Sequence, residues 1–146
     1  MGKVLALCIS ETKGVVKNPI ESVEFIEDYG IAHDAHAGQA PLRQVSLLAI
    51  ESVDLMRDKI PHLKAGDFAE NILVGGLEVK KLPLGTKIRV GKEVLLEVTQ
   101  IGKKCHNAGC AIKRAVGTCI MPAEGIFAKV VKGGVAYTED SIEIVS

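Results

Sequence analysis

The chain has 146 residues, of which 47% are hydrophobic and 25% are charged, a composition that is ordinary for a globular protein. This length predicts one domain over residues 1–146. Lys and Arg together number 18, and so do Asp and Glu, so the formal net charge is zero. A zero net charge argues against a general nucleic-acid or membrane-surface binder, because those proteins normally carry an excess of basic residues.

The amino-terminal residues do not resemble a targeting segment. Their apolar run, residues 4–9, is too short for the apolar core of a signal peptide and leads directly into polar residues. No apolar stretch of the sequence approaches the roughly 20 residues that a membrane helix needs. We therefore expect a cytoplasmic protein with no membrane partner.

Short segments typical of β-strands, separated by glycines, occur along most of the sequence. Residues 4–9 predict a buried strand, and residues 22–26 alternate between apolar and polar side chains, which predicts a strand with one buried face. The Gly91-Lys92 pair between two apolar segments predicts a hairpin, and another turn with a polar stretch is expected around Gly133. Further strands are expected at residues 69–74, 87–90, 93–100, 126–131 and 141–145.

Helical patterns are fewer. Residues 49–60 place their apolar side chains at helical spacing and are followed by Pro61, which ends the predicted helix. A second short helix is expected at residues 111–116, before Gly117. Many short strands and two modest helices predict a mainly β fold, a β-barrel with a few short helices, rather than alternating βαβ units.

Residues 101–110 form a polar segment with glycines near both ends, between the strand expected at residues 93–100 and the helix expected at residues 111–116. We expect this segment to be a surface loop. It contains Cys105, whose chain neighbours are Lys103, Lys104 and His106. Positive charge near a thiol favours the thiolate, which is the nucleophilic form. Cys110 lies near the start of the predicted helix, where the helix N-terminus also favours an anion.

Three hypotheses apply to this segment. The first is a turn with incidental cysteines, and the second is a segment with a reactive thiol. The third is a zinc site built from Cys105, His106, Cys110 and Cys119. The spacing does not match common zinc motifs, and adjacent Cys105 and His106 make an awkward chelate. The residues favour a reactive Cys105, with Cys110 or Cys119 as a possible second thiol. Cys8, in an apolar run, is expected to be an inert core residue.

A second polar segment contains His33, Asp34, His36 and Arg43 within eleven residues. A metal site would need the first three side chains to converge, although neighbours in an extended segment point to opposite faces. Arg43 favours an anion site instead, because its guanidinium group suits phosphate. A solvated loop explains the same residues equally well.

A third polar segment contains Asp67 and Glu70 at the start of the strand expected at residues 69–74. Two carboxylates three residues apart are compatible with a binding site. The pair Gly66 and Asp67 is also common in turns. These residues alone leave both interpretations open.

Five sequence segments, taken together, resemble one known family over nearly the whole chain. They are Gly30-Ile31 with Asp34, His36 and Gly38; residues 43–48; Gly66-Asp67-Phe68 with Glu70-Asn71; Val98-Thr99-Gln100 leading to Cys105; and residues 117–127. Each segment is weak evidence, but their order and spacing resemble the MOSC family, named for the C-terminal domain of molybdenum cofactor sulfurase. The chain is most similar to the compact bacterial-type branch of that family.

The resemblance implies a β-rich, barrel-like fold and one characteristic cysteine, whose position Cys105 occupies. In the family this thiol is thought to carry sulfur or to meet the molybdenum cofactor, so Cys105 is also a candidate ligand to molybdenum. The phosphate of the pterin cofactor needs cationic donors, and its ring needs hydrogen-bonding partners. The candidate cofactor-binding residues are Arg43, Asp34, His36, Asp67, Glu70, Asn71, Lys103, Lys104 and Lys113.

The leading functional hypothesis is a sulfur carrier or sulfur-transfer protein of molybdenum-cofactor metabolism, with Cys105 and His106 as catalytic residues. The 146 residues include no pyridoxal-phosphate desulfurase domain, so we expect a partner such as a cysteine desulfurase. One alternative is a non-catalytic module that binds the molybdenum cofactor. Another is the cofactor-bearing component of a reductase of N-hydroxylated compounds.

Overall fold

A computed structural model describes residues 2–10, 18–34, 37–38, 44–57, 70–101 and 125–145 of the chain. In this part of the chain, seven strands follow one another in the order β11-β7-β8-β9-β5-β6-β1, and β1 pairs with β11 to close a barrel. The predicted mainly β, barrel-like fold is therefore confirmed. The barrel strands are β1 (Gly2–Ile9), β5 (Val45–Ala49), β6 (Ile72–Gly75), β7 (Lys87–Val90), β8 (Val94–Ile101), β9 (Ile126–Lys132) and β11 (Ser141–Ile144).

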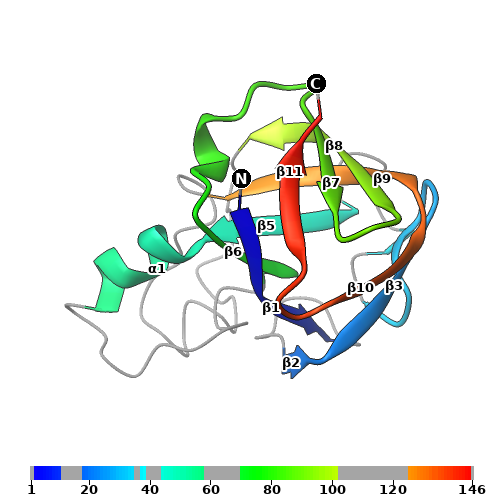
Figure 1. The fold of residues 1–146 in the computed structure, drawn as a ribbon, viewed down its shortest axis with the longest axis horizontal. Coiled ribbons are helices and arrows are strands. Elements are labelled where there is room, and N and C mark those ends of the chain that lie inside the picture. The colour runs from blue at the N-terminus through cyan, green and yellow to red at the C-terminus, as the bar shows by residue number, and fades with distance from the viewer. Residues whose placement is uncertain are drawn as a thin grey trace, which may run out of the picture.

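The remaining elements lie around the barrel (Figure 1). Strand β2 (Asn18–Ile20) pairs with the second half of β1. Strands β3 (Ser22–Ile26), β4 (Gly30–Ile31) and β10 (Gly134–Tyr137) form a small sheet in the order β10-β3-β4. The helix α1 (Ile50–Arg57) leads out of β5, and the short 3₁₀ helix η1 (Val79–Lys81) follows β6.

The barrel interior is filled by aliphatic side chains. Because successive side chains on a strand point to opposite faces, alternate residues of β8 point inward, and Val94, Leu96 and Val98 are at most 1% exposed. Residues of β5, β6, β9 and β11 add to the same core, which also includes Phe25 from the small sheet. Burial of these side chains is the main stabilising contribution to the fold.

A β-bulge in β1 changes which residues of that strand face the interior. The register against β6 shifts between Val4 and Ala6. Val4 lies in the core before the shift and Leu7 lies in it after the shift, both with no exposed surface. In a regular strand Val4, Ala6 and Cys8 would share one face, so the extra residue reverses the alternation.

Most strand predictions agree with the structure, and the hairpin at Gly91 is confirmed by the pairing of Val90 with Val94. Strands β2, β4 and β5 were not predicted. The polar stretch expected after Gly133 is in part strand β10, which pairs with β3. The helix predicted at residues 49–60 is present as α1, while residues 58–60 and the helix at 111–116 lie outside the described residues.

Strands β5 and β6 pair in parallel, with α1 in the connection between them. Parallel neighbours need a long crossover connection, so this part of the chain is one βαβ unit inside an otherwise antiparallel barrel. The sequence prediction of a barrel rather than alternating βαβ units holds, but it did not include this single unit. A short β5 without polar–apolar alternation explains why the unit was missed.

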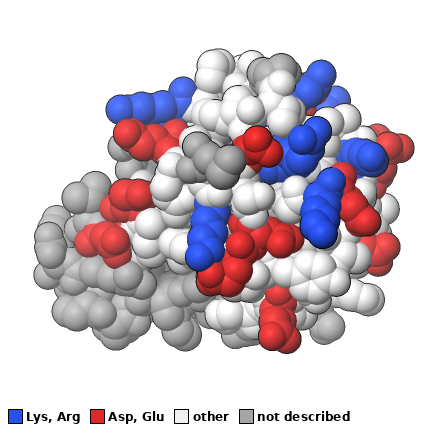
Figure 2. Space-filling view, in the orientation of Figure 1, with Lys and Arg blue, Asp and Glu red and all other residues white. Residues whose placement is uncertain are grey.

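The described surface is of mixed charge. Basic and acidic side chains are interspersed over the face shown in Figure 2, as expected from a net charge of zero. In the described part of the chain, no helix is both long enough and apolar enough to span a membrane.

We expect the substitution Leu96→Ala to lower the free energy of unfolding by about 2–5 kcal/mol, because it removes buried methyl groups and leaves a cavity. Leu96 has no exposed surface, whereas Leu84 is 62% exposed. The matched control Leu84→Ala should change stability by less than about 0.5 kcal/mol. Urea unfolding of both variants measures the difference, and equal effects would contradict the position of the core.

Candidate functional site

The barrel has a second buried face, on the outside of β1, β6, β5 and β9. The inward residues of these strands fill the core, and several of their outward side chains are also at most 4% exposed. The helix α1 packs against β5 and β6 and covers part of this face. Further along β9, Lys129 and Val131 are only partly buried, so the buried outer face is limited to one part of the strands. The outward residues are Cys8, Ser46, Leu48, Asn71, Leu73 and Phe127.

A hydrogen-bond network between Ser46 and Asn71 lies at the centre of this face. The Asn71 side-chain oxygen accepts from the Ser46 backbone N–H at 2.9 Å and from the Ser46 hydroxyl at 3.1 Å. The Asn71 backbone N–H donates to the Ser46 hydroxyl oxygen at 2.9 Å. The Asn71 side-chain nitrogen donates to the Cys8 carbonyl oxygen at 3.0 Å. One asparagine thus connects β5 to β1 across the start of β6.

Asn71, one of the predicted cofactor-binding residues, has no exposed surface. Both polar atoms of its side chain are used inside the protein, which is the usual arrangement for a buried amide. Through these hydrogen bonds Asn71 holds neighbouring strands in position. Its predicted role in binding a cofactor stays a prediction.

Asp34 and Glu70, two further predicted cofactor-binding residues, lie at the ends of strands near this face. Asp34 follows β4, is 6% exposed and accepts a hydrogen bond from the Ser10 backbone N–H at 3.2 Å, just beyond the end of β1. Glu70 directly precedes Asn71 and is 1% exposed. The structure thus places both carboxylates in the protein interior. Carboxylates this deeply buried need hydrogen-bond or charge partners.

Gln44 is a buried polar residue for which the sequence suggested no role. Its side-chain oxygen accepts from the Val130 backbone N–H at 2.9 Å, and its side-chain nitrogen donates to the Asp28 carboxylate at 3.1 Å. Gln44 thereby connects the start of β5 to β9 and to the turn between β3 and β4. In the sequence Gln44 stands directly before an apolar run, where a polar side chain is easily buried, and this position could have indicated that Gln44 is buried.

The described strand ends show where the segment containing Cys105 joins the barrel. Ile101 ends β8 and pairs with Ile126, which begins β9 and pairs with Leu47 of β5. Leu47 is the neighbour of Ser46 along the chain, so these ends lie beside the Ser46–Asn71 network. A register shift between Val98 and Gln100 precedes Ile101, and bulges are frequent beside functional sites.

The other predicted site residues lie outside the described residues. Among the described residues, no group of three or more His, Cys, Asp or Glu side chains could hold a metal ion. The four ligands of the zinc hypothesis are not among those residues, so that hypothesis is untested. The predicted residues outside the described ranges are His36, Arg43, Asp67, Lys103, Lys104, Cys105, His106, Cys110, Lys113 and Cys119.

A family model described as the MOSC domain matches residues 33–143, well over half of the chain. The chain belongs to the MOSC family. The match includes all the predicted site residues, and the family name relates this MOSC domain to the molybdenum cofactor. No curated protein sequence matches the chain significantly.

Solved structures share the fold of this MOSC domain. The YuaD protein from Bacillus subtilis is 22% identical with a TM-score of 0.81, and the match covers 97% of this chain and 94% of that chain. YiiM from Geobacillus stearothermophilus is 18% identical with a TM-score of 0.74, and the match covers 100% of this chain and 76% of that chain. YiiM from Escherichia coli is 17% identical with a TM-score of 0.74, and the match covers 100% of this chain and 70% of that chain. At these identities the likeness shows the fold.

We expect Asn71→Ala to lower the free energy of unfolding by about 2–4 kcal/mol, because it leaves buried partners at Ser46 and Cys8 without their hydrogen bonds. A double-mutant cycle with Ser46→Ala, measured by urea unfolding, should give a coupling energy of about 1 kcal/mol or more. Additive effects of the two substitutions would show that the network does not act as a unit.

Cys8 is expected to resist alkylation in the folded protein, because it has no exposed surface. Iodoacetamide treatment followed by peptide mapping should label Cys8 only after denaturant is added. Labelling of Cys8 in the folded protein, at the rate of a free thiol, would contradict its burial.

Proposed function

We propose that this MOSC domain carries sulfur for molybdenum-cofactor metabolism, with Cys105 as the sulfur-bearing residue. The observation that carries the proposal is the family match over residues 33–143, a range that contains Cys105. The sequence resemblance implies that Cys105 is the family's characteristic cysteine. Its sequence neighbours Lys103, Lys104 and His106 add positive charge that favours the thiolate. The residues that flank this part of the sequence, Ile101 and Ile126, pair with each other next to Leu47, the chain neighbour of Ser46, which is compatible with the proposal.

Sulfur loading is a thiol exchange that needs no external oxidant. The Cys105 thiolate attacks the outer sulfur of a persulfide on a donor protein. A sulfur–sulfur bond forms on Cys105, the corresponding bond of the donor breaks, and the donor cysteine leaves as a thiolate. A cysteine desulfurase, which uses pyridoxal phosphate, is the donor that we propose. The proposal places the protein in the cytoplasm, where thiols stay reduced.

The described residues fit the molybdenum cofactor in part. Asp34 and Glu70 are buried carboxylates, a group that accepts hydrogen bonds from a pterin ring, and Asp34 already accepts one from the Ser10 backbone N–H. The Asn71 side chain bonds to Ser46 and Cys8. The cations that a phosphate needs are, by sequence, Arg43, Lys103, Lys104 and Lys113, which we propose hold the anionic part of the cofactor. When bound, the cofactor would supply the metal centre that receives sulfur.

We expect incubation with a cysteine desulfurase and cysteine to add one sulfur atom to the wild-type protein, as measured by intact mass. Cys105→Ser should abolish the addition without changing the fold, because serine cannot form a persulfide. Reductant should remove the added sulfur from the wild type.

Single substitutions of the other cysteines provide matched controls. Cys8→Ala removes a buried thiol and should leave sulfur loading unchanged. Cys110→Ser and Cys119→Ser show whether a second thiol takes part. A folded wild type that gains no sulfur, or a Cys105→Ser variant that gains as much as wild type, would overturn the carrier proposal. Purification with bound molybdenum cofactor and a molybdenum–sulfur signal would then support the cofactor-binding alternative.

A further inference from the structure

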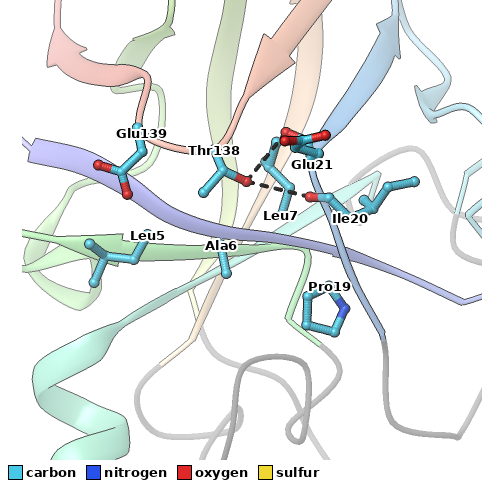
Figure 3. A pocket seen from close by; sticks show the side chains of 8 residues that line it. All are labelled: Leu5, Ala6, Leu7, Pro19, Ile20, Glu21, Thr138 and Glu139. Atoms are coloured by element: carbon cyan, nitrogen blue, oxygen red, sulfur yellow. Dashed lines mark hydrogen bonds between the residues drawn. The ribbon is translucent and has the colours of Figure 1, made fainter.

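A groove of about 460 Å³ lies outside the candidate site, where β1 changes its neighbour from β11 to β2. Figure 3 shows the side chains of β1, β2 and the β10–β11 turn that surround it. We call it the β1 groove. Its lining residues are Leu5, Ala6, Leu7, Pro19, Ile20, Glu21, Thr138 and Glu139.

The β-bulge in β1 explains why the groove exists. Before the bulge, the Val4 backbone bonds to Glu139 and Asp140 of the β10–β11 turn, with both N···O distances at 2.8 Å. After the bulge, Leu7 pairs with Ile20 of β2. Between these two positions the described ladder provides no neighbour on this side of β1. The gap leaves Leu5 and Ala6 at the base of an open groove.

The walls of the groove are held in place by hydrogen bonds of Thr138. Its backbone N–H donates to the Glu21 carbonyl oxygen at 2.9 Å. Its hydroxyl contacts the carbonyl oxygens of Ile20 at 3.4 Å and Glu21 at 3.3 Å, as the dashed lines in Figure 3 show. The groove is therefore formed in the free protein, so a ligand would not have to order its walls.

The groove combines an aliphatic base with an acidic rim. Ile20 is 41% exposed although it is a large aliphatic residue, and Pro19 beside it is also exposed. Glu21 and Glu139 contribute the charge. Glu139 forms an ion pair with Lys3 at 2.5 Å, whereas Glu21 forms no ion pair within the described residues. The exposed carboxylate of Glu21 thus lies beside an apolar surface.

We propose that the β1 groove docks a segment of a partner protein that presents an aliphatic side chain between Lys or Arg residues. The aliphatic side chain packs on Leu5, Ala6 and Ile20, and a neighbouring basic residue pairs with Glu21. Charge complementarity selects a basic segment over an acidic one. The proposal concerns an interaction surface and does not depend on the sulfur-carrier function.

The experiment titrates the ¹⁵N-labelled protein with three capped pentapeptides: Leu between two Lys pairs, Leu between two Glu pairs, and Ser between two Lys pairs. The first peptide should give saturable shifts at the amides of Leu5, Ala6 and Ile20, with a Kd on the order of 1 mM. The other two should bind at least about tenfold more weakly, because each lacks one of the two complementary features. Equal shifts with all three peptides, or none at these amides, would overturn the proposal.

Two variants and a matched control complete the test. Ile20→Asp should weaken binding of the Lys-flanked Leu peptide at least about tenfold. Glu21→Lys should weaken the Lys-flanked Leu peptide and strengthen the Glu-flanked one. Leu84→Asp places the same charge at another exposed aliphatic position, 62% exposed, and should leave binding unchanged. If Ile20→Asp binds like Leu84→Asp and Glu21→Lys shows no reversal, the groove is not a docking site for basic segments.

Discussion

The hydrogen bonds of Asn71 are the constraint on which the rest of the candidate site depends. They connect three strands at the one place where the barrel contains a parallel pair, β5 and β6. Burying an amide and a hydroxyl without partners would cost several kcal/mol, so Ser46 and Asn71 must occupy one relative position. Leu47, the chain neighbour of Ser46, pairs with Ile126, which begins β9 and pairs with Ile101 at the end of β8.

Two of the register irregularities in the barrel, one in β1 and one near the end of β8, shape the molecule in different ways. In β1 the bulge reverses the inward face, so that Val4 and Leu7 both reach the core, and it opens the β1 groove. In β8 the shift after Val98 lies just before the end of the strand, where the Thr99 hydroxyl bonds to the Phe127 carbonyl oxygen at 3.3 Å. Each irregularity lies beside a feature to which we assign a function.

The sequence was informative wherever the cause of structure is local. The Gly91-Lys92 pair between two apolar segments predicted the β7–β8 hairpin, and the apolar surroundings of Cys8 predicted its burial. Strand β5 was missed because all five of its residues are buried, which removes the alternation that marks a strand. The pairing of Ser46 with Asn71 joins residues 25 positions apart, and no local pattern encodes it. Among three hypotheses the residues themselves favoured a reactive Cys105, and the family resemblance related that thiol to the molybdenum cofactor.

The barrel is closed by its first and last strands, because Gly2 pairs with Ile142 and Lys3 with Ser141. During synthesis, β1 leaves the ribosome long before β11 exists. Until then both β1 and β7 present open edges, which are sites for unwanted pairing with other chains. The barrel can therefore close only after β11 has been synthesised, so the edges of β1 and β7 gain the protection of closure later than those of every other barrel strand.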